Sequence, residues 1–194
     1  MNDNLSQQIL ELQSVHSGLQ VQPNQDISGI LVFKAAYSGL ETIEDSFEIK
    51  LMIPENYPSS LPTVFEIAEK IDREYEHINS DRSLCLAVPM EERELFLKKP
   101  TLLGFINNLV VPYFYSYIFW KKYGYYPFGE AAHGREGIQQ YYQDLFQSKN
   151  QSALKLGLYM VAKNGYRGHH SCPCGSGRIL FRCHKVLVYY LAQP

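Results

Sequence analysis

The feature that most constrains the fold is an alternating segment, residues 46–53, that runs directly into a series of prolines. Every second position in it is hydrophobic: Phe47, Ile49, Leu51 and Ile53. The residues between them are mostly polar. Because successive side chains of a strand point to opposite faces, the pattern predicts a strand with one face on a core and one wetter face. Three prolines that each remove a backbone donor should then form a rigid loop: Pro54, Pro58 and Pro62.

Other segments predict helices and strands on both sides of this strand. Asn2-Asp3-Asn4 offers a helix cap, and the apolar spacing after it predicts a helix that ends near Gly18. Further strands are expected over Ile27–Tyr37 and Thr63–Ile67. Residues 89–94 are interpreted as a charged crossover, and the apolar stripe of residues 138–146 predicts an amphipathic helix. A helix, an antiparallel meander and then more helices form an α+β protein.

The longest apolar run, Leu102–Trp120, is almost long enough to span a bilayer. It contains Pro112, Gly104 and two asparagines, so a buried helix that breaks or kinks at Pro112 is favoured over a membrane span. The aromatic residues of 113–126 are assigned to packing. The first residues are polar and lack the basic start and apolar run of a secretory signal, so we expect a soluble, cytoplasmic protein with no membrane partner.

The net charge of −2 hides an asymmetry along the chain. Residues 1–144 carry all 20 acidic residues and 11 basic ones, a balance of −9, whereas residues 145–194 carry seven basic residues and no acidic one. Two explanations stay open: a separate module that docks on an acidic partner, or a tail that folds back on the acidic core. The 194 residues, 45% of them hydrophobic, suffice for one core plus an appendage, and we predict domains at 1–150 and 151–194.

Three of the four cysteines cluster near the end of the chain, in the pattern Cys-x-Cys, eight residues, Cys-His. Three thiolates and an imidazole complete a tetrahedral zinc shell with no open position, so the pattern predicts a structural zinc site. The ligands would be Cys172, Cys174, Cys183 and His184, while His169 and His170 are expected to be surface residues. The alternative is a set of reduced thiols without metal. The segment 171–184 resembles the SEC-C motif of bacterial proteins.

The fourth cysteine, Cys85, stands alone in a polar loop, eight positions after His77 and six after Asn79. A thiol beside hydrogen-bonding side chains suits covalent acyl transfer, because sulfur attacks and leaves well near neutral pH. The alternative is a small buried hydrophobic residue, the usual role of a free cysteine.

Several short motifs around Cys85 occur in a characteristic order: Tyr57-Pro58, Leu61-Pro62, Ile78-Asn79-Ser80 and Ser83-Leu84-Cys85-Leu86. On these motifs the chain resembles the ubiquitin-conjugating (UBC) enzyme family over roughly residues 3–147. The resemblance implies a UBC-like fold with an N-terminal helix, an antiparallel meander sheet and C-terminal helices, followed by the small zinc-binding tail. It also implies an enzyme in which Cys85 takes a ubiquitin-like modifier from an activating enzyme as a thioester and passes it to a lysine amine.

The chain departs from the family's pattern at three places. When the cysteines are aligned without gaps, the family's asparagine falls on His77 and not on Asn79, so both are candidate catalytic residues beside Cys85. Ala87 replaces an often acidic residue, and the usual tryptophan after the cysteine is absent. Such departures resemble the divergent bacterial members found in anti-phage operons of the CBASS kind, which implies a cGAS-like nucleotidyltransferase as one candidate target.

A second function, from a different class, stays open beside the enzyme. The chain would then be a non-catalytic UBC-like adaptor whose basic zinc tail binds an acidic protein or nucleic acid. The presence of Cys85 favours the enzyme.

Overall fold

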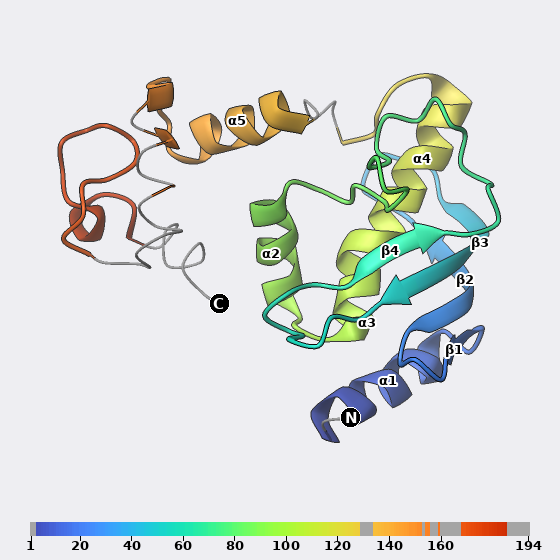
Figure 1. Ribbon diagram of the computed structural model, residues 1–194. Helices are drawn as coiled ribbons and strands as arrows, with labels where there is room; N and C mark the ends of the chain where they lie inside the picture. The colour runs from blue at the N-terminus through green and yellow to red at the C-terminus, as the bar shows by residue number, and fades with distance from the viewer. Residues whose placement is uncertain (1–2, 129–133, 153, 156–158, 160–167, 186–194) are drawn as a thin grey trace. The chain divides into compact units, whose positions relative to one another are not determined.

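The computed structural model describes residues 3–128, 134–152, 154–155, 159 and 168–185 (Figure 1). The chain forms two compact units, residues 1–130 and 131–194. The division lies earlier in the chain than the predicted domain boundary after residue 150.

The first unit begins with helix α1 (Asp3–Val15), which leads into a four-stranded antiparallel sheet. The strands lie in the order of the sequence: β1 (Leu19–Val21), β2 (Ile27–Ala35), β3 (Ile43–Met52) and β4 (Thr63–Glu66). Sequential pairing of neighbouring strands is the predicted meander, and the α+β class is confirmed. The short strand β1 has no counterpart among the predicted elements.

The alternating segment forms most of β3, and its predicted faces are confirmed. Phe47 and Leu51 are 1% and 0% exposed, whereas Met52 is 43% exposed. The inner face packs on a helix, where the rings of Phe47 and Phe114 stack with their centroids 4.0 Å apart. Burial of these large apolar side chains is the main stabilising contribution to a unit of this kind.

Helices α2 (Pro89–Lys98), α3 (Leu102–Phe105) and α4 (Val111–Tyr123) follow the sheet. Residues 89–94, expected to be a charged crossover, therefore begin a helix. A π-helical turn, Ile106–Val110, joins α3 to α4, so the predicted break lies just before Pro112. Proline has no N–H to donate to the preceding turn, and the wider π turn accommodates that loss within an otherwise continuous helix.

This helical segment also meets the length and composition of a membrane span. The mean hydropathy of an 18-residue stretch within Leu102–Tyr123 reaches 1.3, but 72% of that stretch is buried inside the protein. The burial agrees with the predicted core helix. In Figure 1, α3 and α4 lie along one face of the sheet.

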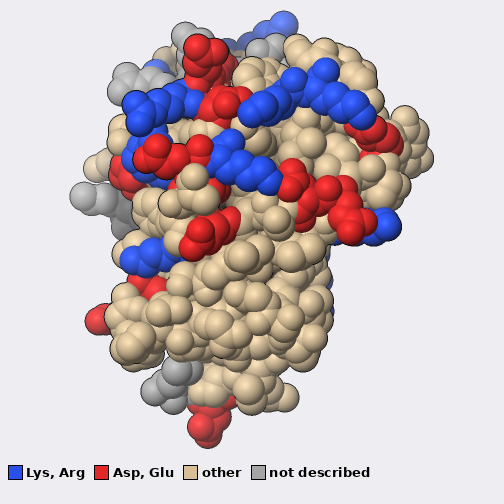
Figure 2. Space-filling view, turned by 90° about the vertical axis from the view of Figure 1, so that its right-hand side faces the viewer, with Lys and Arg blue, Asp and Glu red and all other residues tan. Residues whose placement is uncertain are grey.

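Several ion pairs lie on the surface of the first unit. Lys34 pairs with Glu44 at 3.1 Å, and Lys122 pairs with Glu41 at 2.6 Å. Figure 2 shows basic and acidic side chains side by side over one region of the molecular surface, next to a broad region without charged residues. Exposed pairs of this kind contribute little to stability, so the core carries the fold.

The second unit contains helix α5 (Gly134–Leu145) and a 3₁₀ turn, Leu180–Arg182. Its described core is small and consists of four buried residues: Phe146, Leu154, Cys172 and Leu180. Tyr142 and Leu145 of α5 pack against this cluster.

Candidate functional site

The loop that presents Cys85 is a tight antiparallel turn attached to the edge of the sheet. The Cys85 N–H donates to the His77 carbonyl at 2.9 Å, and the Asn79 N–H donates to the Ser83 carbonyl at 2.8 Å. The Leu84 N–H donates to the carbonyl of Val64 in β4 at 2.8 Å. These bonds fix the backbone on both sides of the thiol.

The tip of this loop is held by a short chain of side-chain hydrogen bonds. Asn79 Nδ2 donates to Ser83 Oγ at 3.0 Å, and Ser83 Oγ donates to Asp81 Oδ1 at 2.6 Å. The hydrogen bond from the Ser83 side chain lowers the pKa of Asp81, because it favours the ionised carboxylate. Arg82 has a φ of 72°, in the left-handed region that a tight turn requires. The Asn79 carboxamide therefore contacts the loop that it belongs to.

His77 lies between the cysteine loop and a group of aromatic rings. Its carbonyl accepts both the Cys85 N–H and the Tyr113 hydroxyl, each at 2.9 Å. Its ring centroid lies 5.1 Å from that of Tyr75 and 5.1 Å from that of Tyr126. The imidazole is thus packed beside the base of the loop and is half-buried.

The Cys85 thiol is half-buried, and its surroundings disfavour the thiolate. Burial raises the pKa of Cys85, and the nearby Glu92 carboxylate raises it further. Burial also raises the pKa of Glu92, although the Ala87 N–H, which donates to Glu92 Oε1 at 3.4 Å, opposes this shift. Both shifts favour the neutral form of each group, the thiol of Cys85 and the carboxylic acid of Glu92.

Sequence reasoning missed Glu92 and Tyr113 as neighbours of Cys85. Glu92 lies in the first turn of α2, where Pro89 occupies the first helical position and Glu91 is also acidic. Proline at that position and acidic residues in the first turn are a helix-start signal, so the helix could have been predicted. The electrostatic effect of Glu92 on Cys85 could not, because the sequence does not show how close the carboxylate lies to the thiol.

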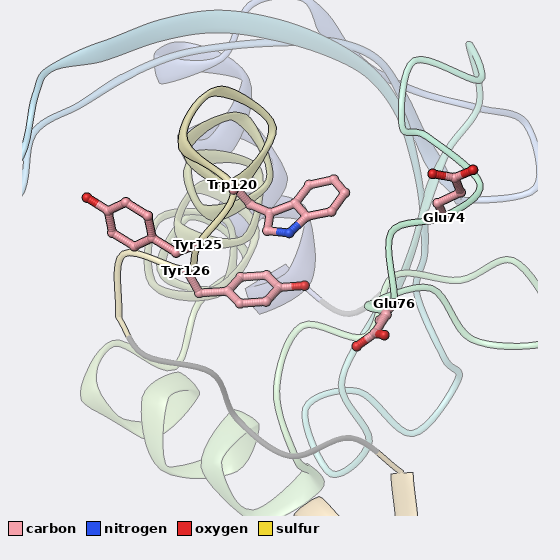
Figure 3. A pocket seen from close by; sticks show the side chains of 6 residues that line it. Glu74, Glu76, Trp120, Tyr125 and Tyr126 are labelled. Carbon is pink, nitrogen blue, oxygen red and sulfur yellow. The ribbon is translucent and has the colours of Figure 1, made fainter.

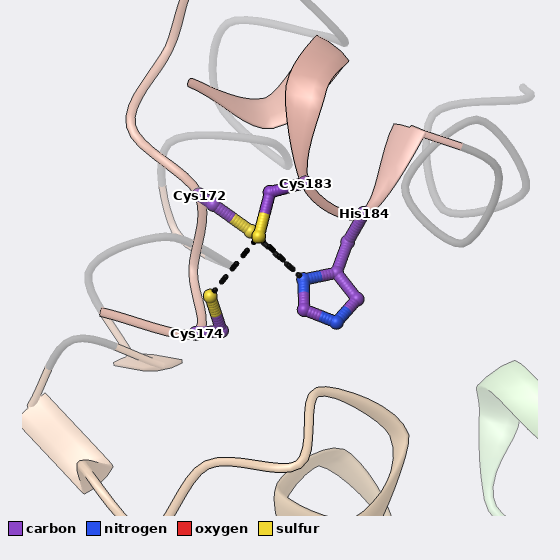
Figure 4. A group of neighbouring side chains, drawn as sticks. All are labelled: Cys172, Cys174, Cys183 and His184. Atoms are coloured by element: carbon purple, nitrogen blue, oxygen red, sulfur yellow. Dashed lines mark hydrogen bonds between the residues drawn. The ribbon is translucent and has the colours of Figure 1, made fainter. Parts of the chain in front are cut away.

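The second candidate site lies in the other unit, where the four predicted metal ligands come together (Figure 4). The ligand atoms of Cys172, Cys174, Cys183 and His184 all lie within 4.8 Å of one another. The His184 Nδ1 atom is 3.1 Å from Cys172 Sγ and 3.3 Å from Cys183 Sγ, and the Cys174 and Cys183 sulfurs are 3.6 Å apart. This group could hold a metal ion.

Two short turns bring these ligands together. After the first pair of cysteines, Gly175 has a φ of 75° and its N–H donates to the Cys172 carbonyl at 3.1 Å. Glycine adopts this left-handed conformation without steric cost, and the resulting turn bends the chain around the sulfurs. The second pair follows the 3₁₀ turn, where the His184 N–H donates to the Leu180 carbonyl at 3.1 Å.

The charge states of the ligands follow from their burial. Burial raises the pKa of Cys172 to about 12, whereas for Cys174 burial is the largest single cause, but hydrogen bonds from Ser176, Cys172 and Cys183 together outweigh it and lower the pKa. Burial, with the charge of Arg178, lowers the pKa of His184, so its imidazole is neutral at pH 7, as a metal ligand must be. His169 and His170 lie outside the cluster.

Comparisons with known proteins add no relative to this description. No family model matches the chain, and no significant match was found among curated proteins or among solved structures.

Proposed function

We propose that the first unit is a UBC-like acyl carrier and that Cys85 is its nucleophile. The observation that carries the proposal is the half-buried thiol on a loop whose backbone is fixed by the bond from the Cys85 N–H to the His77 carbonyl. The charge of Glu92 also raises the pKa of this thiol. The order of the elements supports a UBC-like arrangement, because an N-terminal helix and a four-stranded meander precede the cysteine loop and helices follow it.

The first chemical step would be a thiol exchange with an activated modifier. Cys85 loses its proton to a base, and its sulfur attacks the carbonyl carbon of a thioester carried by an activating enzyme. The carbon–sulfur bond to that enzyme breaks, and its thiolate leaves and takes up a proton. Glu92 is the described carboxylate that raises the pKa of Cys85, which makes it the candidate base.

The second step would pass the acyl group to a lysine amine. The amine nitrogen attacks the thioester carbonyl, the bond to the Cys85 sulfur breaks, and an amide forms while the amine loses a proton. His77 is the candidate group that donates to the developing oxyanion or accepts the amine proton. Asn79 would support the loop, because its carboxamide already bonds to Ser83 Oγ.

The raised pKa of Cys85 has opposite effects on the two steps. It reduces the thiolate available for attack at neutral pH, so the exchange step needs proton transfer to a base. It also makes Cys85 a poorer leaving group, because thiols of low pKa leave faster. A carrier of this kind would keep its acyl group until an amine is correctly placed.

In the second unit we propose a structural zinc site. In a tetrahedral zinc site, the bond lengths imply separations of about 3.8 Å between sulfurs and about 3.6 Å between sulfur and nitrogen. The separation of 3.6 Å between the Cys174 and Cys183 sulfurs is close to the first value, and those of 3.1 and 3.3 Å from His184 to two sulfurs are somewhat shorter than the second. The other pairs of ligand atoms lie within 4.8 Å. When bound, the ion would cross-link the two turns that carry its ligands. Without it, a small core alone would hold these turns together.

Thioester formation tests the acyl-carrier proposal. The protein is mixed with a matched activating enzyme, modifier and ATP, and an adduct that thiol reductants cleave is expected. Cys85→Ser should abolish that adduct or convert it to an ester that resists reductant. Cys174→Ser is the matched control and should still form the labile adduct. A labile adduct that persists undiminished in Cys85→Ala would overturn the proposal.

A non-catalytic adaptor is the second candidate, and the charge of the second unit favours it. Residues 131–194 carry eight basic and two acidic residues, and Arg178, Arg182 and Lys185 are exposed. The test is binding of a fluorescent single-stranded DNA oligonucleotide over a salt series. An adaptor for nucleic acid requires affinity that falls with salt and drops in Arg178→Gln/Arg182→Gln but not in Lys34→Gln, which lies in the first unit. Equal binding in all three proteins would exclude this role.

A further inference from the structure

A cavity of about 310 Å³ in the first unit carries a further inference (Figure 3). Glu74, Glu76, Trp120, Gly124, Tyr125 and Tyr126 line it. Its volume is at the lower end of the range of ligand pockets, which suits a single side chain better than a large cofactor. Its lining combines aromatic rings from the end of α4 and the segment that follows it with two carboxylates from the segment before the Cys85 loop.

The aromatic wall of this cavity is preformed. The rings of Trp120 and Tyr126 are nearly parallel, with an interplanar angle of 17° and centroids 6.3 Å apart. The buried ring of Tyr75 packs on both, at 5.2 Å and 6.2 Å, and so holds them in place from inside. Figure 3 shows Trp120 and Tyr126 directed towards the side of the cavity that carries the two glutamates, while Tyr125 points away.

The acidic wall results from the local sequence Glu74-Tyr75-Glu76. Tyr75 is 3% exposed and belongs to the core, and the two flanking glutamates are exposed at the surface. The cavity therefore joins aromatic surface to negative charge, and this combination attracts an organic cation.

The cavity is also close to the candidate catalytic loop. Tyr126 lines the cavity, and its ring centroid lies 5.1 Å from that of His77. The His77 carbonyl in turn accepts the Cys85 N–H at 2.9 Å. Tyr126 of the lining is therefore connected through His77 to the backbone of Cys85.

We propose that this cavity binds the alkylammonium group of a lysine side chain. The aliphatic stem would lie against Trp120 and Tyr126, and the ammonium would lie near Glu74 and Glu76, which hold it in its charged form. An ammonium held in this way keeps its proton and does not attack the thioester. The cavity would thus hold a basic residue that positions a polypeptide next to Cys85. Only this last assignment, to an acceptor polypeptide, rests on the proposed function.

Trp120 provides the test, because it is the only tryptophan of the chain. Its fluorescence is followed while the full-length protein is titrated with lysine blocked at both ends, as Nα-acetyl-lysine N-methylamide. The norleucine analogue has the same stem without the charge. We expect a saturable change with the lysine compound and affinity at least about fivefold weaker for the norleucine compound, the effect of losing one solvent-screened charge contact.

Charge variants locate the effect in the cavity. Glu74→Gln and Glu76→Gln should each weaken lysine binding by about fivefold, whereas Glu55→Gln, outside the lining, should bind like wild type. In the wild-type protein, added salt should weaken binding of the lysine compound but not of the norleucine compound. The salt series uses the wild-type protein alone, so it does not depend on whether a variant folds.

Two results would overturn the proposal. One is equal affinity for the lysine and norleucine compounds, and the other is lysine binding that is unchanged by salt and by both glutamate substitutions. Thioester formation on Cys85, measured in the same variants, keeps this outcome separate from failure of the proposed function. Cys85→Ala should bind the lysine compound like wild type, because the thiol does not line the cavity.

Discussion

The two units of this protein differ in what holds them together. The first has a core cluster of 28 buried hydrophobic residues, formed by the sheet and the helices that pack on it. In the described part of the second unit, the corresponding cluster has four residues, and one of them is the metal-ligand candidate Cys172. A core of the first kind stabilises a fold by burial alone, whereas one of the second kind needs a cross-link.

The cysteines follow the same division. Cys85 is a single thiol at the surface of a large apolar core, and burial raises its pKa. The other three thiols lie within 4.8 Å of one another and of an imidazole, as metal ligands would. One type of side chain therefore has two candidate uses, a reactive one where the scaffold is rigid and a structural one where the scaffold is small.

Loss of the metal should have the largest effect and should separate the units. Structural zinc contributes about 10–16 kcal/mol in small metal-folded modules, so Cys174→Ser should release the metal and unfold the second unit. Metal analysis combined with hydrogen exchange is the measurement: residues 168–185 should lose protection and β3 should keep it. Cys85→Ser is the control and should retain one zinc per chain. Stoichiometric zinc in Cys174→Ser would refute the ligand assignment.

A substitution that leaves a void in the larger core should lower the stability of the first unit only. Phe114→Ala removes the ring that stacks on Phe47, and we expect it to lower the free energy of unfolding by about 3–5 kcal/mol. Denaturant unfolding followed by Trp120 fluorescence reports on this unit. Val32→Ala, at a position that is 59% exposed, should cost less than about 1 kcal/mol. Loss of zinc from folded Phe114→Ala would contradict independent units.

Substitution of His77 should slow acyl transfer without unfolding either unit. Single-turnover transfer from preformed thioester should fall by about 100-fold in His77→Ala, the usual contribution of a positioned acid or base, while loading of Cys85 continues. His77→Asn should restore part of the rate, because a carboxamide can also donate to an oxyanion. Unchanged transfer in His77→Ala with transfer lost in Asn79→Ala would reverse the two assignments.

The smallest effect should come from Glu92, which acts on Cys85 by charge. Its carboxylate is the second cause, after burial, of the raised pKa of Cys85. Glu92→Gln should therefore lower that pKa, increase the thiolate fraction at neutral pH and speed alkylation of Cys85 by iodoacetamide. The gain should stay below about tenfold, because burial remains.

A pH series of the alkylation rate checks the sign of this effect. The alkylation rate of the wild-type protein should keep rising above pH 9, because the pKa of Cys85 is raised above its ordinary value of 9.0. The rate profile of the variant should shift to lower pH. Slower alkylation in Glu92→Gln would contradict this charge effect. Exchange with the activated modifier, in which Glu92 is the candidate base, should instead slow in the same variant.

Sequence patterns predict the parts of this structure that depend on neighbours along the chain. The alternation of residues 46–53 identified β3 and its buried face, and the spacing of Cys172, Cys174 and Cys183 predicted a cluster that forms within one short segment. Short-range order suffices in both cases. Strand β1 escaped prediction because its three residues are too few to show a period.

The surroundings of Cys85 and the cavity beside His77 depend on tertiary packing, and the sequence does not reveal them. The charge of Glu92 acts on Cys85 across a distance that only the folded structure sets. Trp120 and Tyr126 were assigned to packing, and they do pack on Tyr75, but their outer surfaces line a cavity. A count of aromatic residues cannot distinguish a ring that is enclosed from one that is open on one side.

The division of labour among the cysteines can be tested most directly by mapping iodoacetamide adducts on the folded, zinc-loaded protein by mass spectrometry. We predict one adduct per chain, on Cys85, and adducts on all four cysteines once a chelator has removed the metal. Modification of Cys172, Cys174 and Cys183 in the zinc-loaded protein as fast as that of Cys85 would contradict it.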